Sequence, residues 1–105
     1  MKLFVDDVRD PSFVDHWEVA RTYADAEKLI RTGEVTHISL DYDLGEEKTG
    51  YDLACLIEEL AVTGKIKFPN WRVHSANPVG KMRIQQALTS AERYISNYIS
   101  NAKNQ

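Results

Sequence analysis

The sequence predicts a three-layer α/β domain in which helices flank a parallel sheet. Short apolar or β-branched runs alternate with longer segments whose apolar residues recur at helical spacing. Parallel neighbours need a crossover connection, which a helix between consecutive strands supplies. The length of 105 residues suits one core, so we expect a single domain over residues 1–101 and a polar tail at residues 102–105.

Four segments are predicted as strands. Residues 3–5 (LFV) form a continuous apolar run, as in a strand that is buried on both faces. Residues 17–21 alternate between apolar and polar side chains, residues 35–40 (VTHISL) are rich in β-branched residues, and residues 71–74 resemble these runs. No later run is a candidate for a fifth strand. The prediction is therefore a sheet without its last strand.

Three helices are predicted from start and stop signals. Each begins at a residue that can cap a helix, and the first two end at a glycine. Cys55 falls in the apolar pattern of the second helix and is expected to be buried or half-buried. The signals, in order, are Thr22 and Asp25 before Gly33, Thr49 and Asp52 before Gly64, and Asn77-Pro78 at the start of the last helix.

Composition excludes several classes of protein. The net charge is −3 and no run of Lys and Arg is present, so we expect no binding to duplex DNA. The one cysteine excludes an internal disulfide and a cysteine zinc site. No apolar run approaches the ~18 residues of a membrane span and no signal-peptide core is visible, so a cytoplasmic protein without membrane contact is expected.

Carboxylates follow two of the predicted strands. Asp6 and Asp7 come directly after residues 3–5, and Asp41 and Asp43 follow residues 35–40. The carboxyl ends of parallel strands meet at one edge of the sheet, where ligands of such folds bind. Four acids gathered there repel one another unless a cation lies among them. Their oxygen ligands predict a site for Mg²⁺ or another divalent cation.

Residues that suit a phosphate group lie at the same edge. Arg9 can hold a phosphate bidentately, and His74, Ser75 and Asn77 follow the fourth predicted strand. His74 is a candidate general acid or base, and Ser75 and Asn77 are candidate ligands of phosphate oxygens at the start of the last helix. The sequence therefore predicts a site that handles a phosphate-containing ligand.

These acids resemble the pocket of response-regulator receiver domains, which have a flavodoxin-like fold. In that family such residues bind Mg²⁺ and one carboxylate accepts a phosphoryl group. The chain departs from it through the extra acid Asp43, through His74-Ser75 in place of a small hydroxyl residue, and through the lack of a later strand ending in Lys. A closer resemblance is to the cyclic-phosphate processing receiver domains, carried by residues 3–11 (LFVDDVRDP), 39–45 (SLDYDLG), 49–52 (TGYD) and 74–78 (HSANP).

The resemblance implies an enzyme that processes cyclic phosphates, such as the 2′,3′-cyclic phosphates of RNA ends. In this hypothesis Asp6, Asp7, Asp41 and Asp43 hold the metal, and Asp41 and His74 are catalytic, with His74 protonating the leaving oxygen. A covalent aspartyl-phosphate at Asp41 is a variant of it. Two alternatives remain open: a receiver-like binding or signalling module without turnover, and a domain that acts on or binds cyclic nucleotides or oligonucleotides.

Overall fold

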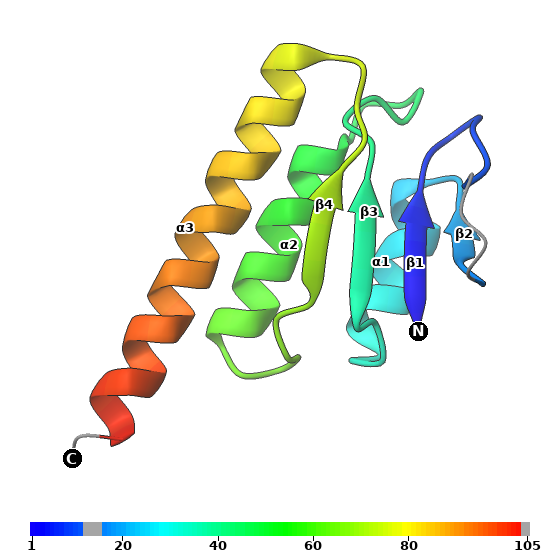
Figure 1. Cartoon of the computed structure of the whole chain (residues 1–105). Coiled ribbons are helices and arrows are strands. Elements are labelled where there is room, and N and C mark those ends of the chain that lie inside the picture. Colours follow the sequence, from blue (N-terminus) through cyan, green and yellow to red (C-terminus); the bar gives the residue numbers. More distant parts are fainter. Residues whose placement is uncertain (12–15, 104–105) are drawn as a thin grey trace.

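The sheet is parallel and has four strands. The computed structural model describes residues 1–11 and 16–103, and the side chains of residues 1–11 and 16–99. The strands β1 (Lys2–Val5), β2 (Glu18–Ala20), β3 (His37–Leu40) and β4 (Asn70–Val73) lie in the order β2-β1-β3-β4 (Figure 1). This is the flavodoxin-like order without a fifth strand among the described residues. The predicted receiver-like α/β fold and the missing last strand are thus confirmed.

The three helices begin where the sequence predicts. They are α1 (Tyr23–Arg31), α2 (Gly50–Val62) and α3 (Pro78–Lys103). The Thr22 hydroxyl accepts the Asp25 amide, Thr49 and Asp52 form a capping box, and the Asn77 side chain accepts the Gly80 amide. The last helix continues to Lys103, past residue 101, where the domain was expected to end. No helix within the described ranges is long and apolar enough to cross a membrane.

All three helices pack on one face of the sheet. Leu3 and Val5 of β1 and Ile38 and Leu40 of β3 form one buried cluster with side chains of α1, α2 and α3. In Figure 1, α1 and α2 lie behind the strands and α3 lies beside α2. Strand side chains alternate, so Phe4 and Ser39 point to the other face. Over the described residues the fold has two layers.

The receiver-like fold is confirmed, and in the described residues its helices cover one face of the sheet. The connection from β1 to β2, residues 6–17, contains no helix in its described residues. In a three-layer fold of this order, a helix in that connection would cover the second face. The thiol of Cys55 differs from expectation, because it is exposed on α2.

One close contact joins the loop after β3 to the start of α3. The aromatic ring of Tyr42 lies against Gly80, so close that a Cβ built on Gly80 would lie 2.2 Å from Tyr42 Cγ. Arg83 Nη1 donates a hydrogen bond to the Tyr42 hydroxyl at 3.2 Å, and its guanidinium lies 4.2 Å from the centre of the Tyr51 ring. The contact holds the end of β3 against the helix that follows β4.

We therefore expect Gly80→Ala to destabilise the protein by about 1–3 kcal/mol, because the new methyl group overlaps the tyrosine ring. In a Tyr42→Ala background the same change should stabilise it by about 0.5–1 kcal/mol, because alanine favours helix over glycine. Urea unfolding of the four proteins measures both differences. If Gly80→Ala changed the free energy of unfolding equally in the two backgrounds, the close contact between Gly80 and the Tyr42 ring would be contradicted.

Candidate functional site

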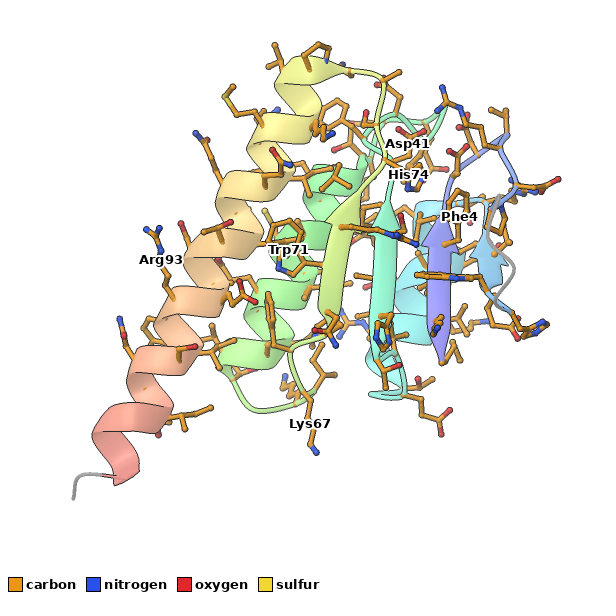
Figure 2. All side chains as sticks on the ribbon, viewed as in Figure 1. Phe4, Asp41, Lys67, Trp71, His74 and Arg93 are labelled. Atoms are coloured by element: carbon orange, nitrogen blue, oxygen red, sulfur yellow. The ribbon has the colours of Figure 1, made fainter. Side chains whose placement is uncertain are left out.

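The register of the sheet places three predicted site residues next to one another. Val5 pairs with Leu40, and Leu40 pairs with Val73, so the residues after them leave the sheet together. The Asp41 amide donates to the Val5 carbonyl at 3.0 Å, and the His74 amide donates to the Leu40 carbonyl at 3.0 Å. Figure 2 shows Asp41 and His74 side by side at this edge.

Asp6 is the most buried member of the site, with a fully buried side chain. Its Oδ1 accepts the backbone amides of Val8 at 3.0 Å and Arg9 at 2.8 Å, and its Oδ2 lies 3.1 Å from His74 Nε2. Burial alone would raise the pKa of Asp6, but these two amides and His74 outweigh it and hold the pKa below 3.8. Asp6 is therefore an anion at neutral pH.

His74 is held on both ring nitrogens and on one ring face. Its Nδ1 lies 2.7 Å from the hydroxyl oxygen of buried Ser39, and the Phe4 ring stacks on it at 4.3 Å between centres and 8° between planes. Burial lowers the pKa of His74 below its ordinary 6.5, although the charges of Asp6 and Asp41 act in the opposite direction. A neutral imidazole fits these contacts, with Nε2–H donating to Asp6 and the Ser39 hydroxyl donating to Nδ1.

Asp41 has the opposite electrostatic environment to Asp6. Burial and the negative charge of Asp6 raise the pKa of Asp41, and a hydrogen bond with the Ser75 side chain only partly offsets them. The two neighbouring carboxyl groups thus have pKa values shifted in opposite directions, an arrangement that marks many acid–base sites. A nearby positive charge would therefore stabilise the ionised form of Asp41 more than that of any other group of this site.

Asp6, Asp41 and His74 form a cluster that could hold a metal ion. One ligand atom from each lies within 4.8 Å of the others, so one ion could contact all three. Two carboxylates suit Mg²⁺, and the imidazole also suits softer divalent ions. Asp7 and Asp43 do not belong to this cluster. Asp43 is exposed, and Asp7 points toward Gly45, on which a Cβ would lie 2.9 Å from Asp7 Oδ2.

The predicted phosphate ligands lie around the cluster. Arg9 is exposed, and its charge is near enough to contribute to the lowered pKa of His74. The Ser75 hydroxyl accepts the Asn77 amide at 3.1 Å. The Asn77 side chain accepts the Gly80 amide at 3.0 Å, so it caps α3. Arg9 and Ser75 can face a ligand, whereas Asn77 is engaged in the helix start.

Two residues of the site were not predicted. Ser39 and Phe4 each precede a site carboxylate by two positions, Asp41 and Asp6 respectively. Residues two apart in a strand lie on the same face, so this spacing was the signal that could have identified them. They matter because Phe4 stacks on the His74 ring and Ser39 contacts its Nδ1, and these contacts fix the position of the ring.

Comparison with known proteins gave one family. A family model described as "Cyclic-phosphate processing Receiver domain" matches residues 1–90. The comparisons with curated proteins and with solved structures gave no match. The matched range covers all four strands, both loops that carry the acids, and His74.

The opposite pKa shifts predict opposite effects of two isosteric substitutions on the metal-free protein at pH 7. A carboxyl group with a raised pKa destabilises the fold above that pKa, so Asp41→Asn should raise the melting temperature. A lowered pKa means that the Asp6 anion stabilises the fold at pH 7, so Asp6→Asn should cost about 1.5–3 kcal/mol. For a domain of this size 1 kcal/mol corresponds to about 4–8 °C.

Thermal unfolding in EDTA measures both effects. Added Mg²⁺ should raise the melting temperature of the wild type more than that of Asp41→Asn, because the variant lacks one ligand. A lower melting temperature for Asp41→Asn in EDTA would contradict the electrostatic account of the site.

The lowered pKa of His74 predicts loss of stability in mild acid. Below about pH 7 the unfolded chain takes up a proton on this histidine that the folded protein does not. The stability that the neutral His74 ring contributes is therefore present above pH 6.5, the ordinary pKa of histidine. It is lost as the pH falls from 6.5 toward the pKa of His74 in the folded protein. His74→Gln should lack this component, so the melting temperatures of wild type and variant should move closer together from pH 7.5 to pH 5.5. A constant difference would show that the folded pKa is not lowered.

Proposed function

Because the chain belongs to the family of cyclic-phosphate processing receiver domains, we propose that it is a metal-dependent phosphodiesterase that opens cyclic phosphates. The 2′,3′-cyclic phosphate at an RNA 3′ end is the substrate class that we propose. The observation that carries the proposal is the Asp6–Asp41–His74 cluster, with its ligand atoms within 4.8 Å, at the carboxyl edge of the sheet. Ligands of such folds bind at this edge.

The carboxylates of Asp6 and Asp41 would hold Mg²⁺ or another divalent cation, with His74 beside them. A cation bound there would polarise a phosphodiester oxygen and lower the pKa of a bound water. Asp7 and Asp43 lie outside the cluster and would act on the cation only through water. Arg9 and the Ser75 hydroxyl would bind the remaining phosphate oxygens.

His74 would move the proton of the reaction. Ser39 can donate to Nδ1 or accept from it, so it supports either tautomer of the neutral ring. In the resting contacts Nε2–H donates to Asp6. Once the Asp6 carboxylate held the cation, the ring would take the tautomer with Nδ1–H donating to Ser39, and the freed Nε2 lone pair would accept a proton from water as the water oxygen bonds to phosphorus. One ring P–O bond then breaks, and the proton passes from Nε2 to the leaving ribose oxygen. The product is a phosphate monoester, and the neutral resting state of His74 suits this base role.

A binding module without turnover is the competing function. Both ring nitrogens of His74 already have partners within the protein, Asp6 and Ser39, an arrangement that would also serve a purely structural histidine. Such a module would hold a cyclic phosphate, a cyclic nucleotide or an oligonucleotide at the same edge. A binder needs no proton carrier, so His74 discriminates between the two functions.

The direct test is incubation with a short oligoribonucleotide that ends in a 2′,3′-cyclic phosphate, with Mg²⁺ or with EDTA, followed by mass spectrometry. We expect a metal-dependent gain of one water. Asp41→Asn should abolish it, and His74→Ala should slow it by ~10²-fold or more. Glu92→Gln, which removes an exposed acid of α3, is the matched control and should act as wild type. Turnover that survives in Asp41→Asn would refute the proposal, and unchanged binding without turnover would favour the module.

A further inference from the structure

The face of the sheet that carries no helix in the described residues continues directly from the site. On each of β1, β3 and β4, the side chains two and four positions before the site residue lie on the same face. The strand register aligns them in two rows. The row next to the site contains Phe4, Ser39 and Arg72, and the row beyond it contains Lys2, His37 and Asn70.

The indole of Trp17 lies between two cations of this face. The Lys2 Nζ is 5.9 Å from the centre of the Trp17 ring, and the Arg72 guanidinium carbon is 5.2 Å from it. Lys2 is on β1 and Arg72 is on β4, so the indole reaches across the intervening strand β3. A hollow of about 260 Å³ opens here, lined by Lys2, Trp17, His37, Asn70 and Arg72 together with Ile38 and Trp71.

The charge of this hollow differs from that of the whole chain. The chain carries a net charge of −3, yet no Asp or Glu of the described residues lines the hollow, while Lys2 and Arg72 both do. Cations beside an aromatic ring are elements with which proteins hold single-stranded nucleic acids, since cations pair with phosphates and rings stack on bases. An interface with another protein would instead be expected to centre on a larger apolar patch.

We propose that this face binds the single-stranded RNA that leads to the cyclic phosphate. A base lies against the Trp17 indole, and the phosphates beside it pair with Lys2 and Arg72. The direction in which the RNA runs rests on the proposed function, in which the cyclic phosphate lies at the Asp6–Asp41–His74 cluster. His37 is four residues before Asp41, about 13 Å along the strand, so the hollow receives a preceding nucleotide and not the cyclic phosphate itself.

The first test measures binding alone. The probe is a dye-labelled short oligoribonucleotide with an ordinary 3′-hydroxyl, and fluorescence anisotropy gives its Kd with the full chain. Lys2→Ala and Arg72→Ala should each weaken binding several-fold and reduce the salt dependence by about one released counterion. Trp17→Phe should retain more binding than Trp17→Ala, because a smaller ring still stacks.

Lys67→Ala and Arg93→Ala are the matched controls. They remove the same charges from the α2–β4 loop and from α3, and Figure 2 shows both residues away from the site. Both controls should bind as wild type does. Arg72→Lys, which keeps the charge, should restore most of the affinity, and thermal unfolding of every variant identifies those that have lost their fold.

The second test separates this proposal from the proposed function. On a mononucleoside 2′,3′-cyclic phosphate, Lys2→Ala and Arg72→Ala should keep the wild-type kcat and KM, whereas on an oligoribonucleotide with the same end they should raise KM. If nothing is turned over but oligoribonucleotide binding still depends on Lys2 and Arg72, the proposed function fails and the RNA-binding face stands. Three outcomes would each overturn the RNA-binding face. They are wild-type affinity in these two variants, no binding by the wild type, and a dimer in sedimentation that Arg72→Ala disrupts.

Discussion

The buried carboxylate of Asp6 is the interaction on which the arrangement of the site depends. It is fully enclosed, so its charge needs hydrogen-bond donors within the protein. The amides of Val8 and Arg9 supply two donors and thereby set the path of the chain as it leaves β1. His74 supplies the third and joins β1 to β4, which are not neighbours in the sheet. One buried charge thus fixes the first loop and the position of the imidazole.

The negative charge of Asp6 makes a second carboxylate at the neighbouring position, Asp41, unfavourable. Asp41 follows β3, the strand between β1 and β4, and burial together with the Asp6 anion disfavours its ionised form. A fold selected for stability alone would hold a neutral residue there. The proposed cation would explain the presence of a second carboxylate at this point, because function often sustains such locally unfavourable groups.

The sequence predicted the elements well because their signals are local. The caps at Thr22 and Thr49 and the abrupt change from apolar run to acid after Val5 and Leu40 depend on neighbours in the chain. The members of the cluster could not be chosen in the same way. Leu3, Phe4 and Val5 are all apolar, so the run does not reveal which face each side chain takes, nor whether Asp6 or Asp7 points to the site.

The other differences arise from tertiary structure. Asp41 and Asp43 would share a face if β3 continued, but the strand ends at Leu40 and the chain turns, which leaves Asp43 exposed. The number of layers depends on the connection from β1 to β2, residues 6–17, and no local signal in the sequence shows which face of the sheet such a connection covers. The role of Ser39 appears only when His74 arrives from β4.

The two-layer architecture also accounts for the chemistry of His74. In a three-layer fold a helix would cover this face of the sheet. Here the Phe4 ring stacks on the imidazole and the buried Ser39 hydroxyl meets its Nδ1, so side chains of the sheet itself provide the surroundings of the histidine. That burial is the main reason why the pKa of His74 is lowered and the ring is neutral at neutral pH. The face that carries no helix in the described residues thus has two parts: Phe4 and Ser39 are buried and keep His74 neutral, and the hollow beside Lys2, Trp17 and Arg72 is where the proposed RNA would lie.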